Sequence, residues 1–164
     1  MTQPALSAGE MLDWLETTSQ RWCALVEGHP EILAMPCDVR GVSTAGGLLQ
    51  HIVAVEMRYA ERLAGLPQTD YAAIAYDSAE AIYAVHSRGM ALLREQLDST
   101  VKWDETIEFP TRSSGTLRAS RKTIFFHATM HSIRHYAQLA TLVRHHGVTP
   151  GWEMDYLFTG AERV

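Results

Sequence analysis

Residues 127–138 read HATMHSIRHYAQ and place a histidine at every fourth position. Side chains four residues apart lie one above the other on an α-helix, so the pattern predicts a helix with His127, His131 and His135 along one side. Two imidazoles at this spacing can bind one metal ion. Three do not readily reach the same ion, because each step of four residues turns the helix by about 40°. Either His127 with His131 or His131 with His135 would bind, and a third ligand would come from elsewhere.

The predicted helix is apolar on nearly every side. One side carries Ile124, Ala128, Leu139 and Leu142, and the other carries Phe125, Ile133, Tyr136, Ala140 and Val143. A helix with this pattern is buried in a core or against a partner chain, and we expect a homodimer that uses the second side. A buried imidazole without a partner costs about 1–3 kcal/mol. Each histidine is therefore expected either to hydrogen-bond a carbonyl or carboxylate, or to bind a metal.

The length and composition favour one domain, residues 1–164, with a core that does not need a metal to fold. A chain of 164 residues buries about 70% of its unfolded surface. A bound metal would then serve function rather than folding, unlike the ion of a small zinc module. Two cysteines, Cys23 and Cys37, do not suggest a disulfide framework.

Several functional classes are disfavoured by charge and hydropathy. The formal net charge is -5 and no run of lysines or arginines occurs, so we expect no nucleic-acid partner. No apolar run approaches about 18 residues, so we expect no membrane span. The N-terminus lacks the charged and apolar regions of a signal peptide. These features favour a cytoplasmic protein.

Helical periodicity and capping signals predict an all-α four-helix bundle. The first helix follows a capping box at Ser7–Glu10 and ends near residue 27, the second runs from Ser43 or Thr44 to before Gly65, the third begins at Asp77–Glu80, and the fourth runs from Ala119 or Ser120 to His146. Residues 98–118 lose this period, and Thr106–Phe109 alternate like a short strand before turn residues. A hairpin or extended segment should therefore precede the last helix. The tail, residues 152–158, should form one or two helical turns that pack back on the bundle.

Two polar residues lie on or beside the apolar face of the predicted second helix. His51 lies at its flank, and is the candidate third ligand because bundles build metal sites from facing helices. Glu56 lies within the apolar face, where a carboxylate is costly unless it is paired. We expect Glu56 to pair with Arg118 or Arg134, or alternatively to support a metal ligand.

The predicted third helix carries two further anomalies. Gly89 costs about 1 kcal/mol relative to alanine in a helix, which indicates close approach of another helix or of a ligand. His86 lies on the same buried stripe. We interpret it as a hydrogen-bonded core histidine, with a role as a further metal ligand as the alternative.

Taken together, two groups of residues resemble the DinB/YfiT-like superfamily of damage-inducible bacterial proteins. They are LQHIVAVE at residues 49–56 and H-x3-H-x3-H-x2-Q at residues 127–138, which Arg144 and Gly147 follow. The tail Asp155–Phe158 is also similar to the ending of that family, and the resemblance covers most of the chain. Tyr136 and Ala137 stand where many members have Arg-Gly, so contacts around the site would differ.

The resemblance implies a four-helix bundle, often dimeric, that holds a divalent metal with three histidines. The matching positions are His51, His131 and His135, which selects the second of the two pairs above and places His127 one turn away. Three histidines with an open position are typical of catalytic sites. Characterised relatives include transferases and isomerases that use low-molecular-weight bacterial thiols, so the implied function is a metal-dependent thiol S-transferase. Zinc or nickel is the expected ion, with iron, copper or manganese as alternatives.

Three other functional hypotheses stay open at this point. A metal-dependent hydrolase would use water as the nucleophile, with Glu56 as its base only if that side chain points at the metal. A non-catalytic, stress-associated metal-binding dimer would fill the remaining position with His127 or His86. The last alternative is a histidine-rich bundle that holds no metal.

Overall fold

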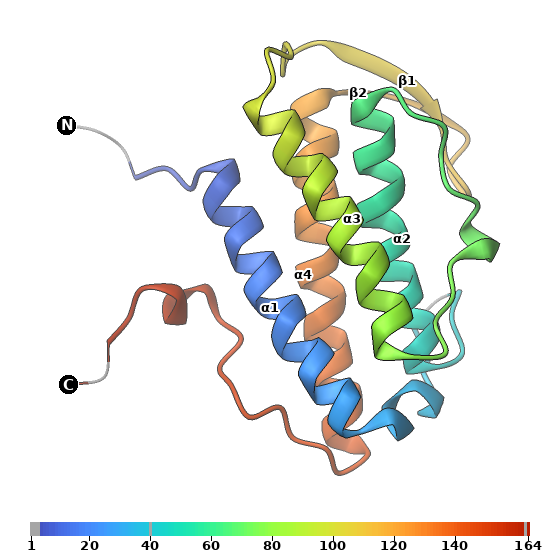
Figure 1. Ribbon diagram of the computed structural model, residues 1–164, viewed down its shortest axis with the longest axis vertical. Coiled ribbons are helices and arrows are strands. Elements are labelled where there is room, and N and C mark those ends of the chain that lie inside the picture. The colour runs from blue at the N-terminus through green and yellow to red at the C-terminus, as the bar shows by residue number, and fades with distance from the viewer. Residues whose placement is uncertain (1–3, 40, 163) are drawn as a thin grey trace.

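A computed structural model describes residues 4–39, 41–162 and 164. Within these residues, four long helices run side by side (Figure 1). They are α1 (Ala8–Gly28), α2 (Ala45–Ala64), α3 (Ala79–Asp98) and α4 (Arg121–His145). Both α1 and α2 pack against α3 and α4. The structure is mostly helical and has the arrangement of a helical bundle, as the periodicity predicts.

Short polar side chains begin each of the four helices. Ser7 and Glu10 form the predicted reciprocal capping box at the start of α1. Thr44 and Ser120 accept hydrogen bonds from backbone amides in the first turns of α2 and α4. These bonds satisfy amides that have no partner within the helix. At the other end of α2, Gly65 adopts φ 70°, a left-handed conformation that stops the helix where predicted.

A small antiparallel sheet joins α3 to α4. Its strands are β1 (Thr106–Pro110) and β2 (Thr116–Ser120), and they arch over the end of the bundle at which α4 begins (Figure 1). Glu108 faces Arg118 in the register, and the two side chains form an ion pair. The predicted hairpin is thus confirmed. Because these residues form a true two-stranded sheet, the fold is not strictly all-α.

The remaining connections contain single turns of 3-10 helix. They are η1 (Pro30–Ala34), η2 (Tyr71–Ala73) and η3 (Tyr156–Thr159). The last of these is the helical turn predicted in the tail. Trp152 meets the ring of Trp22 edge-on at 5.4 Å, and Tyr156 meets Trp14 at 5.2 Å between centroids. The tail therefore packs back on α1, as expected.

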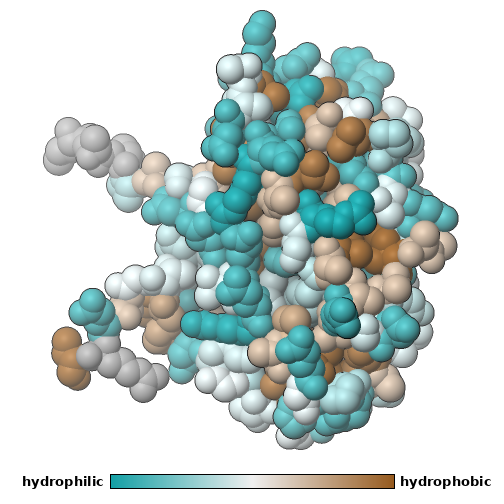
Figure 2. Space-filling view, in the orientation of Figure 1, coloured by the Kyte–Doolittle hydropathy of each residue, from teal (hydrophilic) through white to brown (hydrophobic). Residues whose placement is uncertain are grey.

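The apolar side of α4 on which we based a homodimer faces the interior of its own bundle. Phe125, Tyr136 and Val143 are no more than 1% exposed. The face drawn in Figure 2 shows hydrophobic residues in separate small groups among hydrophilic ones. This apolar side of α4 is therefore already buried within its own chain and gives no support to a dimer. The homodimer stays a prediction.

Among the helices described, none combines the length and apolar character that crossing a lipid bilayer requires.

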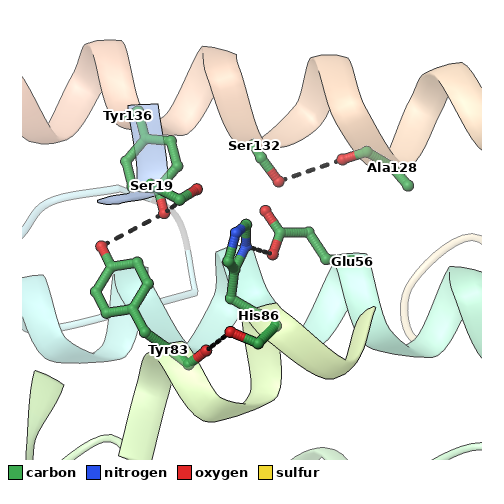
Figure 3. A network of polar contacts seen from close by, with 8 residues as sticks. Ser19, Glu56, Tyr83, His86, Ala128, Ser132 and Tyr136 are labelled. Carbon is green, nitrogen blue, oxygen red and sulfur yellow. Dashed lines mark hydrogen bonds and ion pairs between the residues drawn. The ribbon is translucent and has the colours of Figure 1, made fainter. Parts of the chain in front are cut away.

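A buried carboxylate is paired with a histidine in the centre of the bundle (Figure 3). Glu56 is 0% exposed, and His86 of α3 donates from Nδ1 to its Oε2 over 2.7 Å. The predicted pairing of Glu56 with an arginine is wrong. Arg118 is held by Glu108 in the hairpin, and Arg134 lies beside His135 on α4. The interpretation of His86 as a hydrogen-bonded core histidine is confirmed.

Gly89 allows α3 to approach the backbone of α2. A Cβ atom at this position would lie 3.2 Å from the Met57 nitrogen and 3.4 Å from the Glu56 carbonyl carbon. Backbone atoms cannot move aside as a flexible side chain can. The close approach predicted from Gly89 is therefore confirmed, and the neighbour is a helix.

We predict that Gly89→Ala destabilises the protein although alanine is the better helix former. Overpacking against the α2 backbone should lower the free energy of unfolding by about 1–3 kcal/mol, against a gain of about 1 kcal/mol in propensity. Urea denaturation measures the difference. Gly9→Ala in α1 is the matched control, because its Cβ would meet only the Ser7 hydroxyl at 3.9 Å. A Gly89→Ala protein as stable as the control would contradict the prediction.

We also predict that the His86–Glu56 pair makes stability depend on pH. Burial alone would lower the pKa of His86, but the Glu56 carboxylate outweighs it and raises that pKa above its ordinary value. The pair stabilises the folded protein fully below about pH 6.5, the pKa of a histidine in the unfolded chain. This stabilisation is lost as the pH rises through the raised pKa of His86 in the folded protein. His86→Gln should therefore lower the free energy of unfolding by about 3 kcal/mol near pH 6 and by less near pH 9. Equal losses in urea denaturation at both pH values would exclude a charged pair.

Candidate metal centre

Three histidines meet where α2 packs on α4. Nε2 of His131 lies 3.1 Å from Nε2 of His51 and 3.2 Å from Nε2 of His135. The ligand atoms of all three residues lie within 4.8 Å of one another. A tetrahedral zinc ion, with bonds of roughly 2.0–2.1 Å, separates two nitrogen ligands by about 3.3 Å. The three imidazoles could therefore hold a metal ion.

The two helices supply these side chains in different ways. His131 and His135 are one turn apart, so α4 alone brings them together. His51 comes from α2 and reaches them across the contact between the two helices. His127, one turn before His131, is exposed and lies 5.3 Å from the His131 ring and 4.9 Å from the Tyr59 ring. It borders the cluster without joining it.

The hydrogen bonds of His135 select one tautomer. Its Nδ1 donates to Oε1 of Gln138 over 2.6 Å, and its Nε2 accepts from Nη2 of Arg134 at 3.1 Å. A proton on Nδ1 leaves the Nε2 lone pair directed at the cluster, which is the form that binds metals. Within the described residues, Nδ1 of His131 is buried without a hydrogen-bond partner. The polar contacts of that ring are therefore made only through Nε2.

The electrostatic environment keeps the cluster neutral. Burial, with the positive charge of neighbouring side chains, lowers the pKa of His131 to about 2 and that of His51 to about 4. Burial also lowers the pKa of His135, although the bond to Gln138 opposes it. Metals bind the neutral imidazole, so protons compete weakly for these nitrogens near neutral pH.

Two connections form walls around the cluster. Nε2 of Gln50 donates to the Ile74 carbonyl over 2.7 Å and anchors the α2–α3 connection on α2. This anchor holds Tyr71, whose ring lies 6.4 Å from that of His51. From the turn of the hairpin, the guanidinium of Arg112 stacks 3.8 Å from the centre of the Tyr71 ring.

An open groove of about 650 Å³ runs along α4 beside the cluster. His131 and Arg134 line it, and Phe126 and Met130 contribute apolar surface. Met130 is 60% exposed, which is unusual for a large apolar side chain on a packed helix. The groove offers space for a small molecule next to the three imidazoles.

The structure brings together the three histidines named from the sequence and separates two other candidates from them. His86 and Glu56 pair with each other in the core, and the hydrogen bonds of the three histidines include neither residue. Gln138 was part of the sequence pattern but had no assigned role. Its position three residues after His135 is the signal that could have indicated the contact. Tyr71 and Arg112 lie in connections, where no period marks them.

One comparison with known proteins finds a relationship. A family model described as DinB family matches residues 1–162. No curated protein matches the chain.

We predict that the histidines of the metal-free protein stay neutral well into the acid range. His51 should titrate near pH 4 and His131 lower still, because burial disfavours the imidazolium. Long-range ¹H–¹⁵N NMR spectra of the two rings, recorded as the pH is lowered, measure the titration. Protonation of both rings above about pH 6, near the value of an unperturbed histidine, would contradict it.

Proposed function

The chain belongs to the DinB family, and from this membership and the histidine cluster we propose a metal-dependent enzyme that activates a low-molecular-weight thiol for transfer to a small electrophile. The chain, residues 1–164, would act as one domain. The metal ligands would be His51, His131 and His135. The observation that carries the proposal is the composition of the cluster. Among the described residues it contains three imidazoles and no fourth donor, so a bound ion would keep an open position.

The donor set fits a divalent ion of borderline softness. Zinc or nickel is proposed first, with iron, copper or manganese as alternatives. Such an ion supplies Lewis acidity, which lowers the pKa of a thiol held beside it. The protein's own contribution is orientation and protonation state. Gln138 directs His135, and burial keeps His51 and His131 neutral. The use of a thiol rests on the resemblance to characterised relatives.

The contacts of Glu56 and His86 disfavour the two competing hypotheses, a hydrolase and a closed, non-catalytic metal site. A hydrolase would need a base beside the cluster, and the hydrogen bonds of the three histidines go to one another, to Arg134 and to Gln138. Glu56 is instead held in the core by His86. A closed, non-catalytic site would need His86 or His127 as a fourth ligand. His86 is hydrogen-bonded to Glu56, and His127 meets the ring of Tyr59 edge-on.

We predict about one ion per chain in protein purified without a histidine tag or added metal. His51→Ala, His131→Ala and His135→Ala should each lose most of it, because two imidazoles hold the ion much less tightly than three. Elemental analysis of the folded proteins measures the content. His127→Ala is the matched control on the same helix and should keep its ion. A wild-type protein that binds no ion, even after incubation with zinc or nickel, would remove the proposal.

The same proteins test whether the site is open to a thiol. Cobalt(II) should replace the native ion, and an added thiol should then produce a thiolate-to-cobalt charge-transfer band. If no added thiol changes the absorption spectrum of the cobalt protein, the closed, non-catalytic site is favoured instead. Circular dichroism separates loss of the ion from loss of the fold in each variant.

A further inference from the structure

Two arginine side chains border the histidine cluster without an ion-pair partner in the described part of the chain. Nη2 of Arg134 lies 3.1 Å from Nε2 of His135. The guanidinium of Arg112 stacks on Tyr71, and the Tyr71 ring lies beside His51. Three other arginines of this protein are neutralised. Ion pairs to Asp or Glu side chains are formed by Arg94, Arg118 and Arg121.

The positive charge of these two side chains reaches the cluster. Arg134 hydrogen-bonds His135 directly, and Arg112 stacks on the Tyr71 ring beside His51. The three imidazoles are uncharged and receive no carboxylate hydrogen bond from the described residues. A divalent ion would add further positive charge. This corner of the molecule therefore attracts an anion.

The contact of Arg134 would also change when the histidines bind an ion. Arg134 now donates to the Nε2 lone pair of His135. An ion on that nitrogen would take the same lone pair, and Arg134 would need another acceptor. A guanidinium presents a rigid fork of donors that matches a carboxylate, and such charge-assisted bonds are about twice as strong as neutral ones.

From these contacts we propose that Arg112 and Arg134 bind a carboxylate group of the molecule that occupies the open position beside the three histidines. The inference rests on the proposed function and defines its substrate class as a carboxylate-bearing thiol. The two arginines come from different elements, α4 and the hairpin turn. The apolar part of the molecule would lie along Phe126 and Met130 in the adjoining groove.

A matched pair of thiols tests the proposal on the cobalt(II) protein. 3-Mercaptopropionate carries a negative carboxylate, and in its methyl ester one added methyl group removes that charge. The charge-transfer band should give a dissociation constant roughly tenfold lower for the acid. Arg134→Gln and Arg112→Gln should each reduce this preference, whereas Arg88→Gln, an exposed position on α3, should leave it unchanged. Equal affinity for acid and ester, or a preference that survives in both arginine variants, would overturn the proposal.

A second experiment needs no metal and separates failure of this inference from failure of the proposed function. Succinate is added to the metal-free protein, and the ¹H–¹⁵N signals of the arginine Nε–H groups are followed. Saturable shifts of the Arg112 and Arg134 signals are expected, while the Arg88 signal stays in place. If the protein binds no cobalt but shows these shifts, the proposed function is wrong and the anion site is retained. Absence of the shifts would overturn the anion site itself.

The location of the carboxylate follows from combining the probes. Succinate that competes with 3-mercaptopropionate on the cobalt protein places the group on the thiol, as proposed. Succinate that binds together with 3-mercaptopropionate, without competition, places the carboxylate on the second substrate and overturns that assignment.

Discussion

A carboxylate buried in the middle of α2 constrains how the helices of the bundle pack, because it must reach its partner. Glu56 has no access to solvent and reaches its partner, His86, only because Gly89 lets α3 approach closely. This contact fixes the rotation of α2 about its axis. Five residues along a helix correspond to about 140° of rotation, so His51 points to a different side from Glu56. That side faces α4, where His131 and His135 lie.

Helices supply the imidazoles of the cluster, and one helix and one connection supply the charged side chains around it. The imidazoles come from α2 and α4, whose packing holds their nitrogens close and uncharged. The charged neighbours Arg112 and Arg134 lie around the cluster, one on the hairpin turn and one on α4. A positive site built from neutral ligands and external guanidiniums can bind an ion and an anion together. Carboxylate ligands in the same place would have repelled the anion.

The sequence contained most of the fold and part of the site. Helical period and caps predicted the four helices and the hairpin, because local patterns record which side is buried. The spacing of His131 and His135 predicted their contact, and the bundle pattern predicted His51 as the facing candidate. The choice of this histidine pair over the pair with His127 came from the family resemblance. The partner of Glu56 was predicted wrongly, since pairing across 30 residues depends on how helices pack. Tyr71 and Arg112 could not be predicted, because positions in connections have no period.

The stacking of Arg112 on Tyr71 joins two connections that are far apart in sequence, the α2–α3 connection and the hairpin turn. Neither contributes an imidazole to the cluster. Insertions, deletions and substitutions in these two segments could therefore accumulate in evolution while the packing of α2 on α4 stays intact. One bundle could in this way acquire new specificities by changes in the α2–α3 connection and the hairpin turn. Grafting a different hairpin is the corresponding strategy for engineering.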